Sequence, residues 1–149
     1  PVCKLTKDVT TSSAADWVAA RMRDASAADI AIEPRSNVEQ GLRSGIVTAL
    51  DVRAMFPFTD SVAKIKVTAK ALQDFVSEEP DLALAGATIF EGDVCIGGKK
   101  LAANRSYTLA VPDWYATHSP ALKGSPLVPL RKTIPQLVTD YLSSHFSRN

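Results

Sequence analysis

The residues of this sequence best suited to a function are aromatic side chains at bends, and the function they suit is ligand binding. Phe58 follows Phe56 and Pro57. Pro57 forces a bend, because a proline pushes the residue before it out of the helical region and supplies no N–H. Trp114 and Tyr115 stand directly after a predicted strand, at the start of a proline-rich loop. Such rings either cover the core as a plug or stack on a flat ligand as a platform, and both interpretations stay open here.

A polar loop offers hydrogen-bond donors. It runs over Pro34–Gly45, follows a short predicted strand, is punctuated by glycine and is long for a connection. Arg35, Asn37 and Arg43 are the donors that it could present to an anionic or hydroxyl-rich ligand. Loops at the carboxyl end of a strand often carry function, and a solvated surface loop is the alternative.

Metal-dependent catalysis by this chain alone is not expected. His118 and His145 lie outside any cluster of carboxylates, and Cys3 and Cys95 match no zinc or redox spacing. The two cysteines permit one disulfide or none. A net charge of +1 without a stripe of Lys and Arg argues against nucleic acid as a partner. No apolar run is long enough to cross a membrane, so no membrane partner is expected either.

The chain has the size of one domain. Its 149 residues are 46% apolar and 22% charged, which is ordinary for a globular domain that buries its own core. The chain opens at Pro1 rather than at a methionine, and we therefore expect a fragment of a longer protein. For that reason the lack of a signal peptide says little about the compartment.

The stretch Leu50–Phe75 is expected to be a packing nucleus. A short helix stops at Phe56, the elbow at Pro57 follows, and Val62–Val67 then alternates apolar and charged residues as a half-buried strand does. One face of this strand is apolar and consists of Ala63, Ile65 and Val67. The opposite face carries Lys64 and Lys66. The helix that follows repeats its apolar residues at helical spacing, at Ala69, Leu72, Phe75 and Val76.

Three helix starts are marked by a hydroxyl residue with an acid or amide three positions later, the pattern of a capping box. The pairs are Ser13 with Asp16, Thr48 with Asp51, and Thr133 with Gln136. The first helix is predicted to bury one face made of Ala14, Trp17, Val18, Met22 and Ala25. The last helix is predicted to bury Ile134, Leu137, Val138, Tyr141, Leu142 and Phe146.

The remaining segments are predicted to be short strands and loops. Asp29–Glu33 has the composition of a buried strand, and Tyr107–Val111 that of another. Ala87–Phe90 and Val94–Ile96 are joined by a Glu-Gly-Asp turn and predict a hairpin. Pro112–Lys132 contains four prolines and is expected to be irregular. Helices and mostly antiparallel strands thus alternate without strict βαβ order, which favours an α+β layered domain.

The order of several short motifs resembles the C-terminal domain of the 5′-nucleotidase family. In that family a strand ending in an Asn-Gly-Gly-x-Ile-Arg loop leads to a Gly-x-Ile-Thr turn, a short helix and a Pro-Phe-Gly-Asn elbow. The similar segments here are, in that order, Ala31–Glu33, Gly45–Thr48, Asp51–Phe56 and Pro57–Asp60. Further on, Lys99–Val111 looks like the segment that enters the family's Tyr-containing strand, and Pro112–Ala116 like its Asn-Phe-Leu-Ala motif. The similarity spans most of residues 12–146.

This resemblance implies a fold and a division of labour. The fold would be a layered α/β/β/α sandwich with mixed and antiparallel sheets. A separate N-terminal metallophosphoesterase domain, missing from this chain, would hold two divalent metal ions and hydrolyse the substrate. The present chain, residues 1–149, would be a single domain that grips a nucleoside or nucleotide. Its parent protein would be a nucleotide-hydrolysing phosphohydrolase of nucleotide catabolism, periplasmic or secreted.

The resemblance also implies a binding site. The family holds the base between two aromatic rings, and the matching positions are Phe58 in the elbow and Trp114 after the second strand. Stacking on each ring contributes on the order of 1–3 kcal/mol and tolerates any base. Asp60 stands at the last position of the elbow motif. The substrate-binding residues expected are Phe58, Trp114, Arg35, Asn37, Glu33 and Asp60.

Three departures from the family pattern concern the phosphate and the sugar. Glu33 replaces an amide and Pro34 a glycine, and Arg35 is shifted from the position of the loop arginine. The segment before the first helix, Thr10–Ser13, lacks an arginine that helps to hold phosphate, and His118–Ala121 replaces a Gly-Gly-Asp-Gly loop. A carboxylate at Glu33 would repel an anion.

Three interpretations therefore remain. The first is a substrate-recognition domain in which Phe58 and Trp114 stack on the base and Arg35 and Asn37 contact sugar or phosphate. The second is a non-catalytic structural or interaction module in which the aromatic residues only pack. The third is a relative with another substrate, because Glu33 suits a cationic or hydroxylated ligand better than a phosphate.

Overall fold

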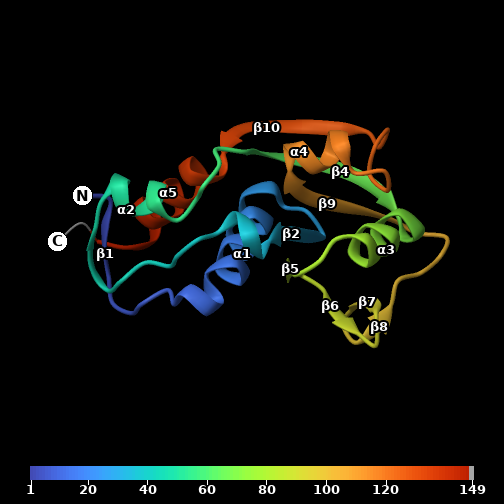
Figure 1. Cartoon of the computed structure of the whole chain (residues 1–149), viewed down its shortest axis with the longest axis horizontal. Coiled ribbons are helices and arrows are strands. Elements are labelled where there is room, and N and C mark those ends of the chain that lie inside the picture. Colours follow the sequence, from blue (N-terminus) through green and yellow to red (C-terminus); the bar gives the residue numbers. More distant parts are fainter. Residues whose placement is uncertain (148–149) are drawn as a thin grey trace.

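A central mixed sheet carries the fold. The computed structural model describes residues 1–147, and its largest sheet has five strands in the order β10-β4-β9-β2-β5. Figure 1 shows an elongated molecule, with the N-terminus, α2 and α5 at one end and α3 and the small sheet β6-β7-β8 at the other. A further pair of strands, β1 and β3, forms a two-stranded sheet near the N-terminus.

The elements alternate along the chain without a regular repeat. The helices are α1 (Ala14–Ser26), α2 (Ala49–Ala54), α3 (Ala69–Glu78), α4 (Asp113–His118) and α5 (Ile134–His145), with 3₁₀ turns η1 (Thr11–Ser13) and η2 (Arg35–Asn37). The strands are β1 (Cys3–Leu5), β2 (Ile30–Pro34), β3 (Gly45–Val47), β4 (Ser61–Thr68), β5 (Leu82–Ala85), β6 (Thr88–Phe90), β7 (Asp93–Ile96), β8 (Lys99–Lys100), β9 (Ser106–Pro112) and β10 (Leu127–Thr133). The predicted α+β class with mixed sheets is confirmed.

The register of the three middle strands decides where the loops lie. β2 runs parallel to β9, with Ile30 opposite Leu109, while β4 runs antiparallel to β9, with Val62 opposite Pro112. The carboxyl ends of β2 and β9 and the amino end of β4 therefore lie side by side at one end of the central sheet. The outer strands β5 and β10 pair antiparallel to β2 and β4.

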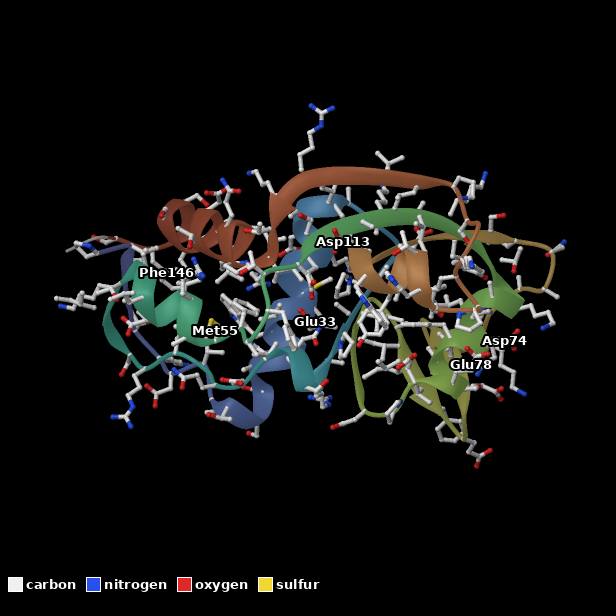
Figure 2. All side chains as sticks on the ribbon, turned by 45° about the horizontal axis from the view of Figure 1, so that its top comes forward. Glu33, Met55, Asp74, Glu78, Asp113 and Phe146 are labelled. Atoms are coloured by element: carbon white, nitrogen blue, oxygen red, sulfur yellow. The ribbon has the colours of Figure 1, made fainter. Side chains whose placement is uncertain are left out.

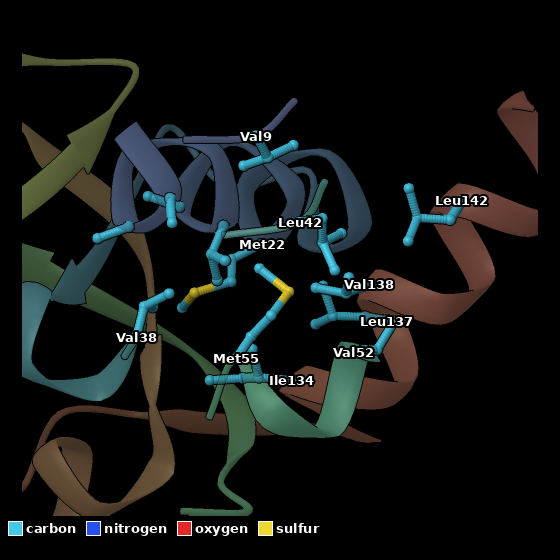
Figure 3. Close-up of a cluster of buried hydrophobic side chains, with 14 of the residues drawn as sticks. Val9, Met22, Val38, Leu42, Val52, Met55, Ile134, Leu137, Val138 and Leu142 are labelled. Atoms are coloured by element: carbon cyan, nitrogen blue, oxygen red, sulfur yellow. The ribbon is translucent and has the colours of Figure 1, made fainter. Parts of the chain in front are cut away.

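Each face of the central sheet is covered by its own hydrophobic core. One core packs α1, α2 and α5 against small sheet residues such as Ala31 and Ala110, and Figure 3 shows the part of it around Met22 and Met55. The other packs α3 and α4 against the larger side chains Ile32 and Ile65. Both cores follow from strict alternation in the strands, which sends neighbouring residues to opposite faces.

The packing nucleus predicted from Leu50–Phe75 is present. In β4 the residues Ala63, Ile65 and Val67 are buried in the core under α3, and Lys66 is exposed on the opposite face. The predicted apolar face of α3 is fully buried. The capping box at Thr48 and Asp51 forms, with both side-chain hydrogen bonds present, and α2 ends at Ala54, two residues before the predicted stop.

Other predicted elements are also confirmed. The hairpin forms from β6 and β7, and Tyr107–Val111 lies within β9, with Tyr107, Leu109 and Val111 in the core under α3. In α5 the Thr133 hydroxyl accepts a hydrogen bond from the Gln136 N–H. Four residues of the predicted α5 face are buried, and Tyr141 and Phe146 pack partly buried against them.

The start of α1 differs from the prediction. The Ser13–Asp16 capping box does not form, because the 3₁₀ turn η1 precedes the helix and leaves Ser13 in a helical conformation. The Ser13 hydroxyl bonds back to Thr10 instead. Ala25 is exposed, and the helix buries Ala14, Ala15, Val18, Ala19, Met22 and Ser26. Trp17 is half-buried against Tyr141.

The prediction that Pro112–Lys132 forms one irregular loop is wrong. Pro112 stands at the N-cap of α4, a position that needs no N–H, so it starts a helix instead of breaking one. Pro129 lies in β10, which pairs only with β4 at the edge of the central sheet, where a strand tolerates a residue without an N–H. The pairing shifts between Pro129 and Thr133, as a bulge does.

The segment before α1 contains regular pairing. Cys3–Leu5 forms β1, and Val9 pairs with Leu42 across an isolated bridge. Cys3 and Cys95 are both buried and free, in β1 and β7, so the pair forms no disulfide. Within residues 1–147, none of the helices has the length and apolar character that crossing a membrane demands.

We expect the substitution Phe75→Ala to destabilise the fold strongly. The Phe75 side chain is fully buried in the core under α3, and removing a buried phenyl ring costs about 3–5 kcal/mol. Phe90→Ala is the matched control, because the Phe90 ring lies exposed at the hairpin and its loss should change stability by about 0.5 kcal/mol or less. Urea unfolding of both variants measures the difference, and equal midpoints would contradict this description of the core.

Candidate ligand-binding pocket at the end of the central sheet

A pocket of about 320 Å³ opens at the end of the central sheet where the carboxyl ends of β2 and β9 lie beside the amino end of β4. Its lining consists of three aromatic rings, one amide and one carboxyl: Phe58, Trp114, Tyr115, Asn37 and Asp60. We call it the aromatic pocket. Four of the six predicted site residues line it, and a fifth, Glu33, is bonded to its wall through Asn37.

Three separate connections supply these side chains. Asn37 ends η2, which follows β2 directly, and Trp114 and Tyr115 occupy the first turn of α4, which follows β9 directly. Phe58 and Asp60 belong to the elbow that enters β4. The residues lie far apart in the sequence, and the strand register brings them to one place.

Phe58 and Trp114 are unusually exposed for large apolar residues. Their exposed fractions are 63% and 52%. Both rings line the same pocket, so a flat ligand there could cover apolar surface that water now covers. A single exposed aromatic ring needs no explanation, whereas two on one cavity are typical of a binding site.

Tyr115 and His118 hold the Trp114 ring in place. The Tyr115 ring meets Trp114 edge to face at a centroid distance of 5.0 Å and packs in turn on the buried Phe75. The His118 ring stacks on Trp114 at 4.5 Å, with 3° between the ring planes. His118 Nδ1 lies 2.9 Å from the Trp114 carbonyl oxygen, one helical turn earlier. Tyr115 therefore serves as the plug over the core, and Trp114 is the ring left partly open.

Glu33 is a fully buried acid beside the pocket. Its side chain has no exposed surface and lies in the interior of the molecule (Figure 2). Asn37 Nδ2 donates a hydrogen bond to Glu33 Oε1 at 3.1 Å, and Glu33 Oε2 is buried without a hydrogen-bond partner. Burial raises the pKa of Glu33 to about 8, against the opposing effect of the Asn37 hydrogen bond. Glu33 is thus mostly protonated at neutral pH.

Asp60 and Tyr115 share this acidic surrounding. Partial burial raises the pKa of Asp60, and the nearby charge of Asp113 raises it further. The pKa of Tyr115 is raised by burial first and then by the charges of Glu79, Glu33 and Asp60. Asp60, Asp113 and Glu79 are therefore the carboxyl groups that act on the pocket, besides the mostly protonated Glu33.

Arg35, the sixth predicted site residue, is engaged elsewhere. Its guanidinium donates two hydrogen bonds to the Asp16 carboxylate, at 2.9 and 3.0 Å, and its Nε lies 3.3 Å from Asp81 Oδ1. The Asp16 hydrogen bond raises the pKa of Arg35. Arg35 thereby ties α1 to η2 and to the start of β5, and it does not line the aromatic pocket.

A larger cavity of about 630 Å³ lies between the segment before α1 and the loop before β3. Arg43, the remaining donor of the polar loop, lines this cavity together with Asp8 and Asp51, and none of the aromatic site residues does. Size alone therefore does not point to the binding site. Among residues 1–147 no group of three or more His, Cys, Asp and Glu side chains could hold a metal ion.

Comparison with known proteins identifies the family. The model of the 5′-nucleotidase C-terminal domain matches residues 3–121, which is most of the chain. The chain belongs to this family. The matched range includes the elbow with Phe58 and the segment with Trp114. No curated protein matches the sequence.

Solved structures show the same fold at low sequence identity. A putative 5′-nucleotidase from Staphylococcus aureus, solved in complex with α-ketoglutarate, has a TM-score of 0.83 at 18% identity over 99% of this chain and 38% of that one. A 5′-nucleotidase precursor from Thermus thermophilus has a TM-score of 0.72 at 13% identity, over 96% of this chain and 36% of that one. The NAD nucleotidase of Haemophilus influenzae has a TM-score of 0.70 at 14% identity, over 91% of this chain and 31% of that one. This chain thus spans between about a third and two fifths of the length of each.

Sequence reasoning missed two features of the site. Tyr115 lines the pocket but is absent from the expected binding residues, because the sequence left open whether Trp114 and Tyr115 form a plug or a platform. The burial of Glu33 was also missed, although its place at the end of a strand whose other residues are all apolar was the signal that could have revealed it.

We expect stability to fall as pH rises, because of Glu33. A glutamate titrates near 4.5 in the unfolded chain and at about 8 in the folded one. Between these values the folded state holds a proton that the unfolded state has lost, so the stability present below pH 4.5 is progressively lost up to pH 8. Glu33→Gln cannot titrate, and it should exceed the original protein in stability by roughly 3–5 kcal/mol at pH 8, at about 1.4 kcal/mol per unit.

Urea unfolding at pH 4, 6 and 8 measures this difference. Glu39→Gln, which changes an exposed glutamate, is the control and should follow the original protein at every pH. If Glu33→Gln shows the same dependence on pH as the original protein, Glu33 does not titrate in this range.

Proposed function

We propose that this chain is the nucleoside- or nucleotide-recognition domain of a 5′-nucleotidase-like phosphohydrolase, with the base stacked between Phe58 and Trp114. The observation that carries the proposal is that these two half-exposed rings, supplied by the elbow and by α4, line one pocket. The family to which the chain belongs and the nucleotidases that share its fold support it.

The rings suit a base for energetic reasons. Stacking contributes about 1–3 kcal/mol per base for each aromatic ring and accepts any base, because every base has a π face. Tyr115 holds Trp114 against the core, so part of the entropy of ordering that ring is already lost in the free protein. The polar groups within reach of the sugar hydroxyls are the Asn37 amide and the Asp60 carboxyl.

The catalytic steps would belong to another domain. In this proposal an N-terminal metallophosphoesterase domain of the same protein holds two divalent metal ions and hydrolyses the phosphate ester. This chain spans only 38%, 36% and 31% of the three relatives, and these fractions support a longer parent protein. Nucleotide catabolism outside the cytoplasm, in the periplasm or after secretion, is supported by the description of one relative as a precursor.

The phosphate would also be held by that partner domain. Arg35 could reach a phosphate only by giving up its ion pairs with Asp16 and Asp81. The same observation favours a second candidate, a non-catalytic structural or interaction module on this fold whose ligand site has degenerated. The two candidates differ in whether the aromatic pocket binds a nucleoside at all.

We expect adenosine to quench the fluorescence of Trp114, and Phe58→Ala to weaken its binding about tenfold, which corresponds to ~1.4 kcal/mol. The sequence contains two tryptophans, so the titration uses a Trp17→Phe background in which only Trp114 emits. Phe90→Ala, which removes an exposed ring from the hairpin, is the control and should bind adenosine unchanged. A lack of quenching at millimolar adenosine would favour the non-catalytic module.

We also expect the purified chain to show no phosphatase activity when Mn²⁺, Zn²⁺ or Mg²⁺ is added, because hydrolysis requires clustered metal ligands. The measurement is release of phosphate from AMP and from a chromogenic phosphate ester. Turnover that persists after repeated purification and disappears with a chelator would contradict the assignment of catalysis to another domain.

A further inference from the structure

The aromatic pocket has an unusual charge composition for a site that would bind an anion. Three of its five lining residues are aromatic and one is Asp60, and none is Lys or Arg. A positive charge is stabilised over the faces of aromatic rings, most strongly over tryptophan, and more so when water is excluded. Carboxyl groups beside such rings strengthen the preference for a cation.

Other carboxyl groups surround the pocket. Asp113, at the start of α4, acts on Asp60, and Glu79 acts with Asp60 on Tyr115. The buried Glu33 is mostly protonated at neutral pH and adds little charge. The nearby cation Arg35 is paired with two carboxylates. His118 stacks on Trp114 and lines the adjoining cavity together with Asp60 and Asp113. The lining itself offers a ligand three aromatic rings, the Asp60 carboxyl and the Asn37 amide.

Glu33 lies behind the pocket wall and leaves one polar atom unsatisfied. Its Oε2 atom is fully buried and has no hydrogen-bond partner, while its Oε1 atom accepts from Asn37, which lines the pocket. An unpaired buried carboxyl oxygen costs free energy, and native structures seldom keep one without a reason. Because Glu33 is mostly protonated at neutral pH and does not line the pocket, the negative charge that a ligand meets there comes from Asp60.

We propose that the aromatic pocket selects a flat, positively charged heterocycle, such as a ring nitrogen that is alkylated or ribosylated, over its neutral counterpart, with Asp60 as the residue that determines this preference. The inference rests on the proposed stacking of a base between Phe58 and Trp114 and adds the charge of the ligand to it. It gives this domain a substrate class narrower than nucleosides in general, and it leaves recognition of an anionic group to residues outside the pocket.

Two matched pairs of small molecules test the preference. Nicotinamide and 1-methylnicotinamide share one ring, and only the second has a fixed positive charge. Adenosine and 1-methyladenosine share ring and sugar, and the second is mainly cationic at neutral pH. Binding is followed by NMR at the indole N–H of Trp114, assigned with Trp17→Phe, because cationic rings quench fluorescence on collision. We expect the charged member to bind roughly tenfold more tightly in at least one pair.

Asp60→Asn removes the charge and keeps the shape, and it should reduce the preference within a pair to about threefold or less. The measured quantity is the ratio of the two affinities, because a lost contact that both members of a pair make cancels in that ratio. Asp24→Asn, which changes an exposed carboxylate on α1, is the matched control and should keep the preference. Equal or weaker binding of the charged member in both pairs overturns the inference. A preference that Asp60→Asn leaves intact overturns it too, because the charge would then act elsewhere.

Phe58→Ala separates this failure from failure of the proposed function. If stacking is correct and the charge inference is wrong, Phe58→Ala weakens both members of a pair alike and the original protein does not distinguish them. If Phe58→Ala changes the binding of neither member, the stacking proposal itself fails and the inference fails with it.

Discussion

The pairing of β9 with parallel β2 on one side and antiparallel β4 on the other is the constraint on which the site depends. This register places the carboxyl ends of β2 and β9 and the amino end of β4 at one end of the sheet. A slip of one residue along β9 would turn its core residues to the opposite face, and both hydrophobic cores oppose such a slip. The alternation that builds the cores therefore also sets the position of Trp114 relative to Phe58.

Charge is divided unevenly between the scaffold and the pocket. Arg35 is the cation closest to the site in sequence, and its charge is used within the scaffold. It pairs with Asp16 and Asp81 and so joins α1 to the turn after β2. The carboxyls of Glu33 and Asp60 remain beside the aromatic rings, partly or wholly removed from water. Because burial penalises a charged carboxylate, Glu33 is mostly protonated at neutral pH, and Asp60 is the acid on the pocket wall that a positively charged ligand would stabilise. This division separates the site from an ordinary phosphate-binding loop.

The fold persists among relatives that share less than a fifth of their residues with this chain. Layered packing requires apolar residues at alternating and helical positions and is indifferent to their identity. The loops at the sheet edge are free to change because they contribute little to either core. The resemblance to the family pattern implies aromatic rings at positions 58 and 114 and altered polar loops, which is the combination expected when the ligand changes more than the scaffold.

The sequence by itself determined the local elements with strong periodicity: the alternation in β4, the apolar faces of α3 and α5, and the bend at Pro57. These depend on neighbours within a few residues, so they can be recognised without the rest of the chain. It also placed Phe58 and Trp114 at bends. Only the tertiary structure decided that both rings line one pocket, that Glu33 is buried, and that Pro129 sits in an edge strand. Each of these outcomes depends on contacts between segments distant in the chain, and strand register, which no local pattern encodes, selects those contacts.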